Sequence, residues 1–183
     1  MKRPELLAPA GSMDALIAAV NSGADAVYLG STRFGARAYA GNFDEQQLRQ
    51  AVHYCHQHEV KVYVTVNTLI FENELDDAKA LIDFLYHNDV DALIVQDLGL
   101  VSWIRRAYPD FELHASTQMH IHNREGSLAL MRSGSNSCDV INVIHTKWLQ
   151  NQVQHFAACR GRFNATAAAG GKLQSVTEEF QAL

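Results

Sequence analysis

DALIVQD, at Asp91–Asp97, has the composition of a buried β-strand followed by polar residues. Its apolar residues, 92–95, form one short continuous run, and Gln96 and Asp97 end it. GADAVYLG, at Gly23–Gly30, has the same build about two strand-helix units earlier, at roughly 30 residues a unit. The repetition predicts successive β/α units with a parallel sheet. Ligands of such sheets bind at the carboxyl ends of the strands, so the polar residues after each apolar run are the candidates for a site.

Length and composition favour one folded domain. The chain has 183 residues, of which 48% are hydrophobic, and this is enough to bury a core. A net charge of -5 argues against binding nucleic acid through overall basicity. Cys55, Cys138 and Cys159 have no metal-like spacing, which favours free thiols in a reducing compartment. No apolar run approaches the roughly 20 residues of a membrane helix, so we expect a cytoplasmic protein and no membrane partner.

The apolar periodicity predicts five β/α units before residue 133. Strands are expected at 5–9, 26–29, 60–66, 91–96 and 111–115, and helices at 13–21, 44–58, 72–87, 98–108 and 123–132. These units predict an α/β fold, an incomplete TIM-barrel-like arrangement of about five to six of eight units. An open doubly wound sheet is the alternative. We expect residues 1–133 to form the barrel part and 134–183 an atypical tail, with one further strand and helix.

Seven side chains are candidates for ligand binding. Arg33 and Arg37 lie in a long glycine-containing connection, where guanidinium groups suit a carboxylate or phosphate, although solvated arginines are the alternative. The others follow strands: Asn67, Gln96, Asp97, His114 and Gln118. Asn67, Gln96 and Asp97 line a pocket or, equally, cap the next helices. Two alternating histidines, His120 and His122, would suit a metal only if the strand continued, and we expect no metal site.

Six motifs in order resemble the amino-terminal half of the U32 peptidase family, often called collagenase-like proteases. They are PELLAPAGSMDAL (Pro4–Leu16), GADAVYLG (Gly23–Gly30), FGARAYAGNF (Phe34–Phe43), VKVYVTVNT (Val60–Thr68), DALIVQDLGL (Asp91–Leu100) and ELHASTQMHIHN (Glu112–Asn123). The resemblance implies a TIM-barrel-like domain. It also implies either peptidase activity or oxygen-independent hydroxylation of tRNA or rRNA bases or of ubiquinone precursors, with prephenate as donor and an iron-sulfur cluster in the RNA-modifying branches. FGAR followed by ASTQ is most similar to those branches.

The chain departs from the family after ASTQ. The VVLARE-like strand and the cysteine-bearing stretch are missing, and Cys138 and Cys159 match no ligand position. A cluster needs about four thiolates, so we expect no cofactor in this chain. The tail after Gly134 is expected to be non-homologous, as a frameshift or gene fragment would produce. No serine nucleophile elbow, Cys/His pair or HExxH supports hydrolysis.

The sequence therefore predicts a truncated U32 member whose full-length parent hydroxylates a tRNA or rRNA base. That parent would bind RNA and a prephenate-like anionic small molecule. The alternatives are a peptidase acting on peptides and a non-catalytic fragment that self-associates through exposed sheet edges.

Overall fold

The computed structural model describes residues 5–36, 42–121, 123 and 125–126. The elements, in chain order, are β1 (Leu7–Pro9), α1 (Met13–Asn21), β2 (Ala26–Gly30), α2 (Glu45–Gln57), β3 (Lys61–Val66), the 3-10 turn η1 (Glu72–Glu74), α3 (Leu75–His87), β4 (Ala92–Val95), α4 (Leu98–Ala107), β5 (Glu112–Ala115) and the 3-10 turn η2 (Thr117–Met119). The predicted boundary near residue 134, the tail beyond it and most of the helix expected at 123–132 lie outside the described residues.

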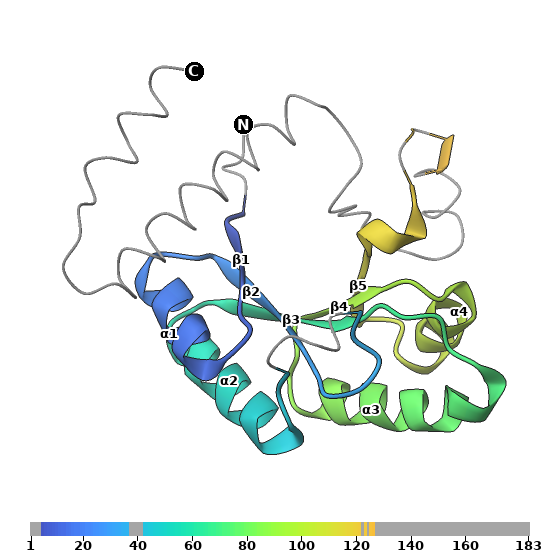
Figure 1. The fold of residues 1–183 in the computed structure, drawn as a ribbon, viewed down its shortest axis with the longest axis horizontal. Coiled ribbons are helices and arrows are strands. Elements are labelled where there is room, and N and C mark those ends of the chain that lie inside the picture. Colours follow the sequence, from blue (N-terminus) through green and yellow to red (C-terminus); the bar gives the residue numbers. More distant parts are fainter. Residues whose placement is uncertain (1–4, 37–41, 122, 124, 127–183) are drawn as a thin grey trace.

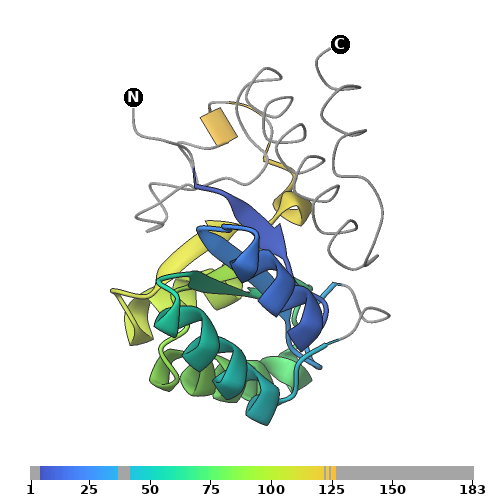
Figure 2. The same ribbon diagram turned by 90° about the vertical axis from the view of Figure 1, so that its left-hand side faces the viewer.

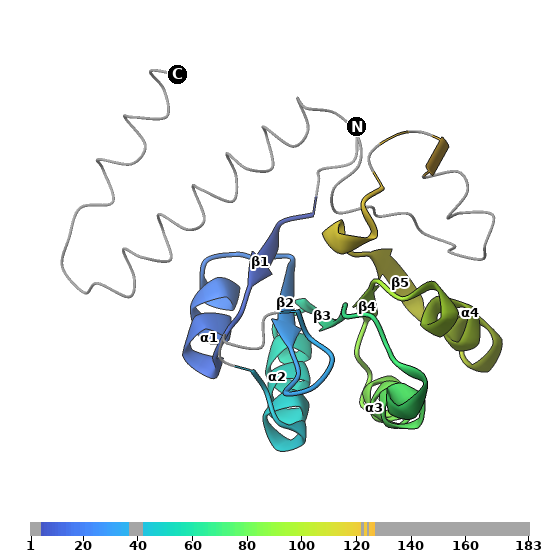
Figure 3. The same ribbon diagram turned by 45° about the vertical axis from the view of Figure 1, so that its right-hand side comes forward.

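The five strands form one parallel sheet in the order β1-β2-β3-β4-β5. Helices α1 to α4 all lie on the same side of this sheet (Figures 1 and 3). Figure 2 shows the same one-sided arrangement from a perpendicular direction. A doubly wound sheet would reverse its strand order and carry helices on both faces. The predicted barrel-type α/β fold is therefore confirmed, and the doubly wound alternative is excluded. β1 and β5 end the described sheet, and self-association there stays a prediction.

Alternation along β3 divides the sheet into an outer and an inner face. Val62, Val64 and Val66 belong to the main core, on the side of the helices. The buried stripe predicted for α2 is confirmed, since Leu48, Ala51, Val52 and Cys55 are its buried residues. Tyr63 instead belongs to a smaller apolar cluster on the inner face, with Ala26, Ala92 and Ile94. The outer face therefore anchors the helices, and the inner face is available for polar groups and a site.

Side-chain caps set the helix starts that the sequence predicted. The Ser12 hydroxyl accepts the Ala15 N–H, and Asp44 forms a reciprocal capping box with Gln47. The helix expected over 72–87 is interrupted, because η1 precedes α3. There the Glu74 carboxylate accepts the Phe71 N–H at 3.0 Å, which stabilises a separate first turn. In the described part of the chain, the helices are all too short or too polar to cross a bilayer.

Charged and aromatic side chains from β3, β5 and the residues before β1 meet on the inner face. The Glu5 carboxylate accepts hydrogen bonds from the Tyr63 hydroxyl at 2.6 Å and the Lys61 ammonium at 3.1 Å. A hydrogen bond of 3.0 Å joins His114 Nε2 to Glu112 Oε1, and the Tyr63 and His114 rings meet edge to face. Burial, together with the hydrogen bond to Glu5, raises the pKa of Tyr63 above its ordinary value. These contacts link Glu5, β3 and β5 across the inner face of the sheet.

Burial of Cys55 makes stability fall at alkaline pH. Burial, with a smaller contribution from Asp91, raises the pKa of the Cys55 thiol to about 12, against roughly 8.5 in an unfolded chain. The folded state thus favours the neutral thiol, and the resulting stability is complete below about pH 8.5 and is lost as the pH rises toward 12. Between pH 8.5 and 10.5, urea titrations should show a steeper decline for wild type than for Cys55→Ala, by up to about 1.4 kcal/mol per pH unit. Parallel declines would contradict this assignment.

Candidate functional site

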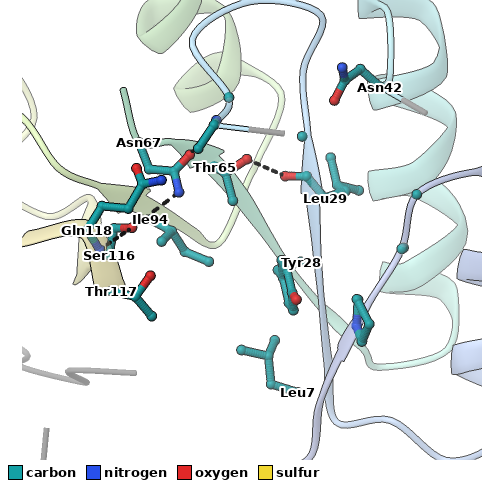
Figure 4. Close-up of a pocket in the computed structure, with 16 residues that line it drawn as sticks. Leu7, Tyr28, Leu29, Asn42, Thr65, Asn67, Ile94, Ser116, Thr117 and Gln118 are labelled. Atoms are coloured by element: carbon teal, nitrogen blue, oxygen red, sulfur yellow. Dashed lines mark hydrogen bonds between the residues drawn. The ribbon is translucent and has the colours of Figure 1, made fainter. Parts of the chain in front are cut away.

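A pocket of about 300 Å³ opens at the carboxyl ends of the strands. Its lining comes from residues of β1, β2, β3 and β4 and from the connections that follow β1, β2, β3 and β5. Figure 4 shows its side chains, which converge on one hollow from both sides of β3. A volume of this size lies at the lower end of the range for small-molecule pockets. The sheet therefore presents one candidate site, at the edge where parallel α/β folds bind ligands.

The pocket has an apolar wall and a neutral polar wall. Leu7, Tyr28 and Ile94 supply the apolar surface (Figure 4). Hydroxyl and amide groups supply the polar surface, on Thr65, Asn67, Ser116, Thr117 and Gln118. Tyr28 is the single titratable side chain among the described lining residues. Such a lining suits an uncharged, flat ligand that offers hydrogen-bond donors and acceptors along its edge.

Asn67 joins three connections of the pocket. Its side-chain oxygen accepts the Ala36 N–H at 3.0 Å, and its amide nitrogen donates to the Ser116 hydroxyl at 3.2 Å. Its own backbone N–H donates to the Phe34 carbonyl at 2.9 Å. The residue at the end of β3 thereby fixes the connection after β2 and the turn after β5. These hydrogen bonds make Asn67 a positioning residue for the pocket wall.

The connection after β2 contains a bulky residue in an unfavourable backbone conformation. Phe34 has φ 60°, a left-handed value that non-glycine residues adopt rarely. Its carbonyl accepts the Asn67 N–H and, at 3.4 Å, the Thr68 hydroxyl. At the base of this connection, Ser31 and Phe43 form an isolated parallel bridge. These contacts hold the strained residue in place, as is common beside functional sites.

Of the two predicted arginines, Arg33 is described by the structure and does not line the pocket. The Arg33 guanidinium pairs with Asp77 of α3 and lies 5.3 Å from the centre of the Phe34 ring. Arg33 lines a second hollow of about 130 Å³, outside the sheet, with Leu48 and Leu81. Arg37 lies outside the described residues. A role for either arginine in ligand binding stays a prediction.

Two of the other predicted residues, Asn67 and Gln118, line the pocket. The Gln96 amide lies next to them and donates to the Gln118 carbonyl at 3.4 Å. His114 is buried in the inner face and hydrogen-bonded to Glu112. After β5 the chain enters η2, and His120 adopts a left-handed conformation, so the alternation of side chains stops there. His122 lies outside the described residues.

The sequence left Asp97 either as a pocket residue or as a helix cap, and in the structure it caps α4. One carboxylate oxygen accepts the Leu100 N–H at 2.8 Å, and the other accepts the Ile70 N–H at 3.3 Å. Replacing Asp97 with alanine should lower the free energy of unfolding by about 1–3 kcal/mol, because a cap and a loop contact are both lost. Urea titration measures this loss. Gln96→Ala, which removes one long hydrogen bond, is the neighbouring control and should cost less than about 0.5 kcal/mol.

Sequence reasoning missed the side chains that project from the strands themselves. Tyr28, Thr65 and Ile94 line the pocket but lie within β2, β3 and β4. The signal was present in VKVYVTV, where Lys61, Tyr63 and Thr65 alternate with valines. A strand buried on both faces by apolar layers would read as continuously apolar, so this alternation indicated a more polar inner face.

The described residues do not fit an iron-sulfur cluster. Such a cluster needs several thiolates, whereas Cys55 is buried in α2 and its raised pKa keeps the thiol protonated. The described part of the chain also contains no group of three or more His, Cys, Asp or Glu side chains placed to hold a metal ion. Cys138 and Cys159 lie outside it.

Comparison with known proteins gives matches over most of the region that forms the sheet and pocket. Residues 11–138 match the family described as Peptidase family U32. The chain is 46% identical over 125 residues to the 23S rRNA 5-hydroxycytidine C2501 synthase of Escherichia coli, covering 67% of this chain and 18% of that protein. It is 36% identical over 122 residues to tRNA hydroxylation protein P1 of Bacillus subtilis, covering 67% of this chain and 29% of that protein.

A protease relative and a solved structure complete the comparison. The collagenase of Porphyromonas gingivalis is 33% identical over 138 residues, covering 75% of this chain and 32% of that protein. The structure of the U32 peptidase Mk0906 superposes with a TM-score of 0.59 at 16% identity, covering 74% of this chain and 58% of that one. The fold is thus shared with this solved structure. The chain spans less than a third of the length of each of these three curated relatives.

Proposed function

Because the chain belongs to peptidase family U32, we propose that its strand-end pocket binds a base of tRNA or ribosomal RNA during hydroxylation of that base. The relatives named for RNA hydroxylation support this choice, with 46% identity for the E. coli rRNA enzyme against 33% for the collagenase. An RNA substrate of this kind would place the protein in the cytoplasm.

The observation that carries the proposal is the neutral, two-sided lining of the pocket. Tyr28 and Ile94 offer apolar surface to the face of a ring, while Asn67 and Gln118 offer amide groups to its edge. Enzymes that modify a base take it out of the stack and recognise it in this way, by packing on its face and hydrogen bonds to its edge. A volume of about 300 Å³ is enough for a single base.

A prephenate-like anion as donor is a finer part of the same proposal. The described lining contains neither lysine nor arginine, and the Arg33 guanidinium is already paired with Asp77. We assign the positive charge for such a donor to Arg37, which lies outside the described residues and directly follows Ala36 of the pocket in the sequence. Substitution Arg37→Gln should then weaken binding of prephenate without affecting binding of RNA.

Peptide hydrolysis is the second candidate, and the described pocket offers it little chemistry. The Ser116 hydroxyl accepts hydrogen bonds from the Asn67 amide and the Gln118 N–H. No described lining residue is a histidine or a carboxylate that could take a proton from Ser116 or Thr117. The neighbouring His114 is hydrogen-bonded to Glu112 and does not line the pocket.

Photocrosslinking tests the base-binding proposal without requiring turnover. Single-stranded RNA carrying 5-iodouridine or 5-iodocytidine is irradiated with the full chain, and the crosslinked peptides are identified by mass spectrometry. We expect crosslinks to Tyr28, and a reduction of about tenfold or more in Tyr28→Leu. Tyr54→Leu, in α2 outside the pocket, is the matched control. Crosslinks unaffected by Tyr28→Leu, or gelatin cleavage abolished by Ser116→Ala, would overturn the proposal.

A further inference from the structure

Three large apolar side chains are exposed on the rim of the sheet that carries the pocket. Leu69, Phe71 and Leu98 have exposed fractions of 66%, 71% and 62%. Leu69 and Phe71 lie in the connection after β3, and Leu98 is the first residue of α4, in the unit that begins with β4. They are the exposed large hydrophobic residues of the described part of the chain, so its apolar exposure is concentrated at one edge. We call these three residues the rim patch.

Hydrogen bonds hold the backbone of the rim patch in place. The Ile70 N–H, between the two exposed residues of the first connection, donates to the Asp97 carboxylate, which immediately precedes Leu98. The Phe71 N–H donates to the Glu74 carboxylate. The connection that carries Leu69 and Phe71 is therefore fixed at two consecutive residues, Ile70 and Phe71. A preorganised surface of this kind loses little conformational entropy when a partner binds.

The charges around the rim patch are acidic. The stretch LIFENELDD, at 69–77, contains four carboxylates and no basic residue. Two nearby cations are already paired, Arg33 with Asp77 and Lys79 with Asp76. Glu72 and Glu74 lie beside Phe71 and add negative charge to the patch. RNA phosphates would be repelled here, whereas lysine and arginine side chains would be attracted.

We propose that the rim patch docks a segment of a partner protein that carries large apolar side chains next to lysine or arginine. The apolar side chains would cover Phe71 and Leu98, and the cations would meet Glu72 and Glu74. None of the three patch residues lines the pocket, but Leu69 is two residues from Asn67, which does. A docked partner would therefore lie beside the pocket without filling it. This inference goes beyond the proposed function and does not depend on it.

Peptide selection tests the rim patch with the full chain. A random peptide library is selected on wild type and counterselected on the variant Leu69→Gln, Phe71→Ser, Leu98→Gln. We expect enriched sequences that combine Leu, Phe or Met with Lys or Arg. No enrichment, or enrichment of acidic sequences, would overturn the proposal. Circular dichroism and urea titration of the variant establish that it folds, as expected for exposed positions.

Titration of a selected peptide then separates the two contributions. Phe71→Ser should weaken binding by about tenfold or more, since exposed aromatic residues are frequent hot spots. Glu72→Gln should weaken binding severalfold and reduce its salt dependence, whereas the matched neutralisation Asp14→Asn, on α1, should leave both unchanged. A single-stranded RNA bound in place of the peptide and lost in Phe71→Ser would overturn the assignment to a protein partner. Failure of the Tyr28 crosslinking experiment would leave this result unaffected, because the residues are different.

Discussion

Asn67→Leu is expected to release the connection after β2 from the sheet and to abolish binding in the pocket. Leucine has a similar volume but cannot accept the Ala36 N–H or donate to the Ser116 hydroxyl. The loss of two hydrogen bonds should lower the free energy of unfolding by about 1–3 kcal/mol. The local effect should be larger, because Phe34 keeps its strained conformation only while its neighbours are held.

Two measurements detect the release of the connection after β2 in Asn67→Leu. Urea titration gives the global loss, and limited trypsin digestion gives the local one, as the cleavage rate after Arg33. We expect that rate to rise by about tenfold or more while cleavage at Arg105, in α4, rises only with the global loss. RNA crosslinking to Tyr28 should fall in parallel with the change at Arg33.

Asn67→Asp is the matched control for stability and cleavage. A carboxylate still accepts the Ala36 N–H, and the Ser116 hydroxyl can rotate to donate to its second oxygen. This variant should therefore stay close to wild type in both measurements, although its charge will disturb RNA binding on its own account. Equal cleavage at Arg33 in wild type and Asn67→Leu would refute the positioning role of Asn67.

The order of elements was predictable because local chemistry repeats along this chain. The helix predicted at 13–21 was confirmed, with Ser12 as its cap, since a hydroxyl before an amphipathic stretch is a local signal. β3 was predicted from its β-branched alternation and starts one residue later than expected. The packing of all helices on one face of the sheet was expected from the family resemblance to a TIM-barrel-like domain. The apolar runs alone did not distinguish this arrangement from a doubly wound sheet.

The site was predictable only in part, because its contacts join residues far apart in sequence. Strand ends identified Asn67 and Gln118, which line the pocket. No local pattern indicated that Asn67 contacts Ala36 and Ser116, 31 and 49 residues away. The cap on α4 was one of two equal interpretations of Asp97, and the contact of the same carboxylate with Ile70 was not foreseen. Long-range hydrogen bonds of this kind depend on sheet register, which a single sequence does not specify.

Gly30→Val is expected to fill the pocket while leaving the fold intact. Gly30 ends β2 and lines the pocket, level with Thr65 of β3. A Cβ at this position would lie 2.8 Å from the side-chain oxygen of Asn42 and 3.4 Å from the Thr65 hydroxyl. The Asn42 side chain can rotate away, since the close atom is at its end. The cost of that rotation is offset in part because valine favours a strand more than glycine does.

The two measurable effects of Gly30→Val therefore differ in size. The free energy of unfolding should change by less than about 1 kcal/mol. RNA crosslinking to Tyr28 should fall by about tenfold or more, because the valine methyls would occupy the wall of the pocket beside Thr65, where the base is proposed to bind. Gly99→Ala is the control at the same edge of the sheet, where the added Cβ lies 3.1 Å from the Asp97 carboxylate and outside the pocket. It should leave crosslinking unchanged. Unchanged crosslinking by a folded Gly30→Val protein would contradict binding of the base against β2 in this pocket.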